Sequence, residues 1–267
     1  ESNIGDYFTQ NTPLLDTYTG AAAAYSLRKL RTAYTGSAIR VRRASDNAEQ
    51  DIGFNVFGEL DTVSLASFCS GTDGFVKTWY DQSGSANDAT QTTAANQPKI
   101  YDSVTGVVTE NGKPAVEFTN DNNFNTTSIT GAADAEFYTV TSVNSATEDR
   151  FILNSSSTTQ WAMGAQSGST TAVSTDFGTP TYRINGSISS ISTRGDLYTA
   201  MATNSPVLSV AIGDTSNWTS YSLINRSIAS NSYNLIGYLQ EIVYYTSDQS
   251  ANRTGIESNI NTFYSIY

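Results

Sequence analysis

The sequence has 267 residues, no histidine and one cysteine. These counts exclude a Ser-His-Asp triad, a histidine general base, the common zinc sites and an intrachain disulfide. The net charge is −11 with only 14 basic residues, so no binding to nucleic acid phosphates is expected. Serine, threonine and asparagine make up about a third of the chain, a composition suited to turns and strand faces. The most apolar stretches, such as 206–212, are far shorter than the ~20 residues of a membrane helix.

Taken in chain order, residues 1–15 are interpreted as an N-terminal arm or linker, and 16–267 as a single domain. Ala21–Leu30 is rich in Ala, Leu and Arg and predicts a short helix, which ends before Gly36. A second short helix is predicted over Thr62–Phe68, with Asp61 or Thr62 at its N-terminus.

Most of the remaining chain alternates between apolar and polar residues. Ala38–Arg43 and Phe75–Tyr80 have this strand pattern, and Asn111-Gly112 and Asn185-Gly186 predict two-residue hairpin turns. Further strands are predicted at 137–143, 151–154, 160–163, 197–202, 207–212 and 235–245. A run of short strands is typical of a sandwich or jelly roll. Within 250–267 the apolar residues Ile256, Ile260 and Phe263 have helical spacing, which predicts a terminal helix.

With histidine and thiol pairs absent, paired carboxylates are the strongest chemistry left, and glycoside hydrolysis needs two of them. Six carboxylates lie in or beside predicted strands: Glu117, Glu136, Asp176, Asp196, Asp214 and Glu241. Spacing selects no two of these, and the competing interpretation of each is an exposed carboxylate at a strand end or turn.

Two tryptophans and one loop are further candidates for binding. Trp161 and Trp218 lie near turn-rich sequence, where their rings could form platforms for sugars, although the alternative for each is a place in the core. Asp81 and Asp88 bound a loop of oxygen ligands that could hold a structural calcium ion. A turn held by side-chain hydrogen bonds is the simpler interpretation, and no other cofactor is expected. Cys69 is interpreted as a small buried hydrophobe.

The segment Ser67–Gln91, and within it Thr78-Trp79-Tyr80-Asp81-Gln82-Ser83-Gly84, resembles the catalytic domain of the fungal α-L-arabinofuranosidase B family. The stretches 24–43 and 111–115 are similar too, so that the resemblance is good over about residues 14–118. It implies an all-β, concanavalin A-like jelly-roll β-sandwich with a few short peripheral helices. The same residues are also similar to phage virion and bacterial surface proteins.

The family resemblance implies catalytic roles for two residues. Its nucleophile, a Glu that opens a strand, matches Glu136, and its acid/base, an Asp in a Gly-Asp turn, matches Asp214. The chain departs from the family in two respects. It has no Cys-Cys pair, and the partner of Cys69 is missing near Gly74. The segment between Phe118 and Glu136 is also short where the enzymes carry substrate-binding loops.

Because of these departures, our first hypothesis is a noncatalytic lectin-like or structural domain on a virion, such as a phage tail fibre or decoration module, or on a cell surface. Such a domain would contact cell-surface or plant and algal glycans and other virion or surface chains, and it could form a homo-oligomer. The alternative is a retaining glycoside hydrolase of the α-L-arabinofuranosidase type that uses two carboxylates. A third hypothesis is a structural module without a ligand. All three place the protein outside the cell, on a virion or on a cell surface, and none includes a membrane span.

Overall fold

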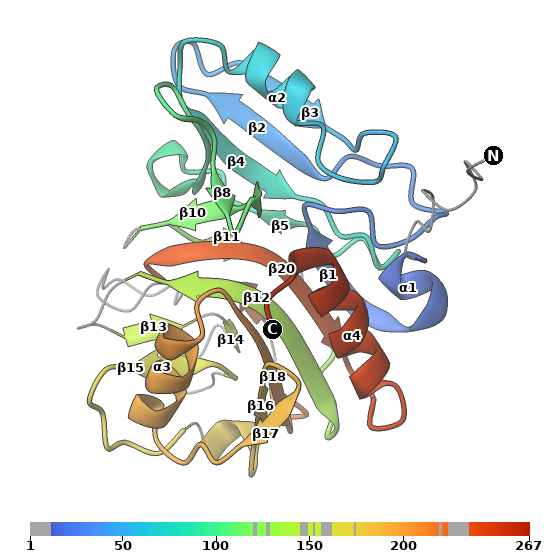
Figure 1. Ribbon diagram of the computed structural model, residues 1–267, viewed down its shortest axis with the longest axis vertical. Coiled ribbons are helices and arrows are strands. Elements are labelled where there is room, and N and C mark those ends of the chain that lie inside the picture. The colour runs from blue at the N-terminus through green and yellow to red at the C-terminus, as the bar shows by residue number, and fades with distance from the viewer. Residues whose placement is uncertain are drawn as a thin grey trace, which may run out of the picture.

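The computed structural model describes residues 12–119, 122–126, 129–144, 149–151, 153–155, 162–173, 175–218, 221–223 and 235–267. Its main sheet is antiparallel throughout and folds into two layers (Figure 1). This confirms the all-β sandwich with few helices.

The strand β20 (Gly237–Tyr245) lies at the centre of the sheet. It pairs with β12 (Ala135–Val143) along one edge, and with β10 (Val116–Phe118) followed by β1 (Ala21–Ser26) along the other. Beyond β12 the order is β18 (Val207–Gly213), β16 (Thr181–Ile184) and β17 (Ser187–Ser189). Because β10 also pairs with β6, the sheet continues from β20 into the second layer.

The second layer is built around β4. Its strands are β2 (Ile39–Arg43), β3 (Glu49–Ile52), β4 (Gly74–Trp79), β5 (Ala89–Thr90), β6 (Lys99–Asp102), β7 (Gly106–Val107), β11 (Phe124–Asn125), β14 (Leu153–Ser155) and β19 (Tyr221–Leu223). Two small two-stranded sheets lie apart from it: β8 (Thr109–Glu110) with β9 (Lys113–Pro114), and β13 (Asp149–Phe151) with β15 (Gly164–Gln166).

The helices are α1 (Leu14–Thr17), α2 (Thr62–Phe68), α3 (Arg194–Thr203) and α4 (Arg253–Tyr264), with the 3-10 turns η2 (Ala94–Asn96) and η3 (Thr175–Phe177). Asp61 caps α2 as expected, since its side chain accepts a hydrogen bond from the backbone N–H of Ser64 at 3.0 Å. Leu14 and Leu15 are buried, so the packed part of the chain begins inside the segment that we interpreted as an arm.

The main core lies between the two layers. Successive residues of the central strands face opposite sides, so Phe137 and Tyr244 point into this core, whereas Tyr138 and Tyr245 point to the outer face. The rings of Phe137 and Tyr244 stack with centroids 4.1 Å apart. Trp79 is fully buried in the same core, as the sequence predicted.

The helix α4 covers the outer face of β20, β12 and β18 (Figure 1). Ile256 and Ile260 of this helix are fully buried against that face. Burial of two such side chains contributes about 3–6 kcal/mol to stability. The expected terminal helix is therefore confirmed.

Two sequence-based assignments of secondary structure have the wrong type. Ala21–Leu30 forms no helix, because 21–26 is the strand β1, nearly all of it buried beside β20. Leu197–Ala202 lies in helix α3, which Thr193 and Asp196 open with a reciprocal capping box. The strand expected at 160–163 is also displaced, because the observed strand is β15 (Gly164–Gln166), while residues 160 and 161 lie outside the described part of the chain. The two hairpins are confirmed, and both Asn-Gly pairs have the positive φ angles that such turns require.

Candidate functional site

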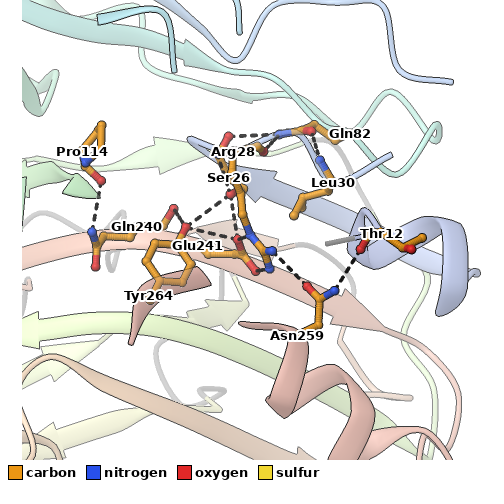
Figure 2. Close-up of polar contacts among 10 residues, drawn as sticks. All are labelled: Thr12, Ser26, Arg28, Leu30, Gln82, Pro114, Gln240, Glu241, Asn259 and Tyr264. Atoms are coloured by element: carbon orange, nitrogen blue, oxygen red, sulfur yellow. Dashed lines mark hydrogen bonds and ion pairs between the residues drawn. The ribbon is translucent and has the colours of Figure 1, made fainter. Parts of the chain in front are cut away.

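A buried polar network joins the beginning of the chain to its end (Figure 2). The Arg28 guanidinium donates to both carboxylate oxygens of Glu241, at 2.7 and 2.9 Å. Ser26 Oγ donates to the same carboxylate at 2.8 Å and Tyr264 donates at 3.2 Å. Glu241 is fully buried and thus has no access to a substrate.

The network continues on both sides of Arg28. Its Nη1 donates to Asn259 of α4 at 2.9 Å. The side-chain amide of Gln82 donates to the carbonyls of Ser26 and Arg28, at 3.0 Å each, and accepts from the Leu30 N–H. These bonds satisfy the backbone where β1 ends, and they give the network a structural role.

Two adjoining cavities open beside this network, and they share Lys29 and Asn55. The first, of about 330 Å³, is also lined by Arg28, Phe57 and Phe263. The second, of about 300 Å³, is also lined by Tyr34 and Phe54. We call this pair of cavities the Lys29 site. Among the described residues no carboxylate lines either cavity, so the Lys29 site lacks the carboxylate pair that hydrolysis of a glycosidic bond needs.

Glu136 lies on the outer face of the sheet beneath α4 and is fully buried. Its carboxylate accepts from Arg253 at 2.5 and 2.9 Å, from Tyr138 at 2.7 Å and from the Gln249 N–H at 2.9 Å. A nucleophile needs a free lone pair directed at the substrate. The carboxylate of Glu136 is therefore not accessible to a substrate, contrary to our expectation. Its role as nucleophile stays a prediction, and these contacts do not support it.

Asp214 is half-buried just beyond β18, and no hydrogen bond among the described residues joins it to Glu136. Its backbone N–H donates to the Phe177 carbonyl, and the Trp218 indole donates to the Asp176 carbonyl, both at 3.1 Å. The fold therefore brings Asp176, which is exposed, into the same loop cluster as Asp214. Hydrogen bonds from the Ser216 hydroxyl and N–H lower the pKa of Asp214. This shift favours the ionised form, which acts as a nucleophile or base rather than as an acid.

The tryptophan expected as a sugar platform is part of the core. Trp218 is 4% exposed and packs on Phe137 and Phe177, with centroids about 6 Å apart. Its ring therefore has no open face for a sugar. Trp161 lies outside the described residues.

The loop 81–88 is held by hydrogen bonds. Both Asp81 oxygens accept from the loop or from β1, at 2.7–3.0 Å from the Ala24 N–H, the Asn87 N–H and the Ser83 N–H and hydroxyl. Asp88 accepts from the Asp81 N–H. The oxygens proposed as calcium ligands are thus engaged by protein donors. Within the described part of the chain, no cluster of three or more His, Cys, Asp or Glu side chains could hold a metal.

The family model of the catalytic domain of α-L-arabinofuranosidase B matches residues 14–201. The chain belongs to this family. Similar proteins are the α-L-arabinofuranosidase B of Aspergillus oryzae, 37% identical over 103 residues, and an α-L-arabinofuranosidase of Hypocrea jecorina, 39% identical over 70 residues. These matches cover 35% and 26% of this chain and 20% and 14% of the relatives, so the chain matches a fifth or less of their length.

The fold agrees with solved structures of this family over 92% of the chain and 64% of theirs. A GH54 α-L-arabinofuranosidase soaked with a cyclic sulfate inhibitor superposes with a TM-score of 0.54 at 18% identity. An arabinofuranosidase complexed with arabinofuranosyl-α-1,2-xylobiose does so with a TM-score of 0.56 at 18% identity.

The match to a catalytic domain overturns our first hypothesis of a noncatalytic lectin-like or structural domain. The missing cysteines and the short segment before Glu136 led to that error, because loss of a disulfide or a loop does not show that catalysis is lost. At the Cys69 position, a Cβ built on Gly74 lies 2.5 Å from the Cys69 sulfur, so the thiol fills the space where its partner is missing.

The Lys29 site was missed because its residues are far apart in sequence and belong to no motif. The one local signal was Asn55-Val56-Phe57-Gly58, a turn that holds an aromatic residue. In the described residues, no helix is long and apolar enough to span a membrane.

Proposed function

We propose that this chain is a glycoside hydrolase domain that removes α-L-arabinofuranose from arabinose-containing glycans. The match of residues 14–201 to the catalytic domain of the arabinofuranosidase B family carries the proposal. The likeness to the solved enzymes supports the fold on which such a site is built. Because arabinose-containing polymers are too large to enter a cell intact, we propose that the domain acts outside the cell.

In the retaining mechanism, one carboxylate attacks the anomeric carbon while a second carboxylic acid protonates the leaving oxygen. Water then cleaves the glycosyl–enzyme bond, with the second group acting as a base. We propose Asp214 as one of the two groups. Asp176 is the other candidate, because it lies in the same loop cluster and is exposed to a substrate.

Hydrolysis of 4-nitrophenyl α-L-arabinofuranoside tests the proposal. The wild-type protein should release nitrophenol, and Asp214→Asn and Asp176→Asn should each lower kcat about 10²–10⁴-fold with little change in KM. Asp46→Asn is the matched control, since it removes an exposed carboxylate that pairs with Arg43. The variant that removes the acid should lose least on the most activated leaving group.

Two results would contradict this proposal at different levels. Full activity in both aspartate variants would show that Asp214 and Asp176 are not the catalytic pair and that other carboxylates catalyse the reaction. Absence of turnover by the folded wild-type protein, on aryl glycosides and on arabinose-containing polymers alike, would reject the hydrolase function itself.

A further inference from the structure

We propose that the Lys29 site binds a carboxylate-bearing sugar, such as a uronic acid residue of a glycan chain. This proposal does not depend on hydrolysis, because none of the described residues that line the site is a carboxylate. It rests on a cation without an ion-pair partner (Lys29), an exposed aromatic ring on a hydrogen-bonded turn (Phe57) and an amide donor (Asn55), which all line the first cavity.

Lys29 differs from the other lysines in its charge partners. Lys77, Lys99 and Lys113 form ion pairs with Glu49, Asp73 and Glu59 at 2.6–3.0 Å. Among the described residues, none makes an ion pair or hydrogen bond with the Lys29 ammonium, although the chain has a net charge of −11. Lys29 is half-buried and lines both cavities. A cation held there without a carboxylate is suited to attract an external anion.

Two further cations, Arg28 and Lys113, hold one wall of the site in place. The Arg28 guanidinium lies 4.9 Å from the centre of the Phe263 ring and Lys113 Nζ lies 4.3 Å from it. Phe263 is thereby fixed as a wall of the cavity between two cations. Arg28 is neutralised by Glu241 and Lys113 by Glu59, so Lys29 supplies the net charge of the site.

Phe57 supplies the surface on which a sugar ring can pack. Its side chain is 63% exposed, although exposed Phe is unfavourable in water. The loop that carries it is tightly hydrogen-bonded, because Asn55 Oδ1 accepts from the N–H groups of Phe57 and Glu59, at 2.9 and 3.0 Å. Gly58 closes the turn with a φ of 75°. The backbone that carries the ring is thus held in place before any ligand binds, which lowers the entropy cost of binding.

The combination of Lys29, Phe57 and Asn55 in one site favours a sugar acid over a simple anion as the ligand. An aromatic face packs on the apolar face of a pyranose, whereas a phosphate or sulfate ion gains nothing from it. With its Oδ1 engaged in the loop, Asn55 can offer its amide N–H groups to a hydroxyl, and Lys29 can pair with the carboxylate. The combined volume of the two cavities, about 330 and 300 Å³, is sufficient for one or two sugar residues.

Calorimetric titration of the full chain with trigalacturonate tests the inference, with its methyl ester as the uncharged matched ligand. We expect saturable binding of the acid at low ionic strength, and about tenfold weaker binding of the ester. Lys29→Gln should weaken binding of the acid about tenfold and leave the ester unchanged. Phe57→Ala should weaken binding of both ligands. Val104→Ala, which alters another exposed apolar residue on a different loop, should change neither. Thermal melts establish that each variant is folded.

Three results would overturn the inference. The first is that trigalacturonate shows no saturable binding at millimolar concentration, and the second is that the acid and the ester bind with equal affinity. The third is that inorganic phosphate competes for the site as well as the sugar acid does. None of these affects the hydrolase proposal, which is measured on a neutral aryl arabinofuranoside.

Discussion

At the scale of single residues, three buried or nearly buried carboxylates each face an arginine from a distant part of the chain. Glu241 pairs with Arg28, and Glu136 and Glu257 pair with Arg253 and Arg183 at 2.5 and 2.7 Å. A buried charge is tolerated only when it is paired and hydrogen-bonded, and each of these three carboxylates accepts both members of an arginine fork. Such carboxylates hold the fold together and are unsuited to chemistry on a sugar.

Replacement of Glu136 by Gln should therefore lower stability. The change removes the 1% exposed partner of Arg253 and leaves its charge with only the exposed Asp248 at 3.8 Å, at an expected cost of about 3 kcal/mol in the free energy of unfolding. Urea unfolding measures the loss, and Glu136→Leu/Arg253→Met should recover much of it because no charge remains buried. A Glu136→Gln protein that is fully stable but has lost turnover would instead support Glu136 as the nucleophile.

Residue roles of this kind were only partly predictable. Cys69 and Trp79 could be placed in the core because each follows an apolar pattern in its own segment. The role of Glu136 could not, because its partner Arg253 is 117 residues away and only the folded chain brings them together. Trp218 lies in turn-rich sequence, but its ring reaches into a core formed by other segments.

At the scale of elements, local signals succeeded where they agreed with the surroundings. The Asn-Gly turns and the capped helix α2 depend on neighbouring residues alone, so the sequence was sufficient. β1 has a helix-favouring composition, but small Ala side chains allow it to lie buried beside β20, and tertiary pairing outweighs the propensity. For α3 the capping signal Thr193-x-x-Asp196 was present in the sequence and was overlooked.

The capping box of α3 leads to a prediction about pH. Hydrogen bonds from the Thr193 and Ser192 N–H groups lower the pKa of Asp196 to about 2, below the ~3.9 of an unfolded Asp. The ionised Asp196 carboxylate therefore stabilises the folded protein fully above about pH 4, and this stabilisation is lost as the pH falls through about 2. Asp196→Asn should lower the melting temperature at pH 6, and this difference should shrink toward pH 2. A difference independent of pH would show that the charge of Asp196 has no part in the cap.

At the scale of the whole molecule, β12 and β20 are the most protected strands, since side chains on both of their faces are buried. One face lies in the main core and the other lies under α4. By contrast β3 and β17 lie at edges of the sheet and expose residues to solvent. Alternation along each strand predicted the sandwich, whereas the order of the strands depends on contacts between segments far apart in sequence.

Amide hydrogen exchange should rank the strands accordingly. Protection in β12 and β20 should approach that set by global unfolding, and β3 and β17 should exchange faster by local opening. Mass spectrometry of peptides from each strand measures the order. Equal protection of β17 and β20 would contradict the burial of β20 on both of its faces.

The pairing of β1 with β20 also bears on how the protein is made. The first strand of the sheet finds its partner only in residues 241–245, and Arg28 meets its carboxylate only at Glu241. Residues 21–26 must therefore stay unpaired during synthesis until residues 241–245 have left the ribosome. Contacts of such long sequence separation slow folding and leave apolar surface open to aggregation in the meantime. Production of this domain should accordingly be sensitive to temperature and to chaperone supply.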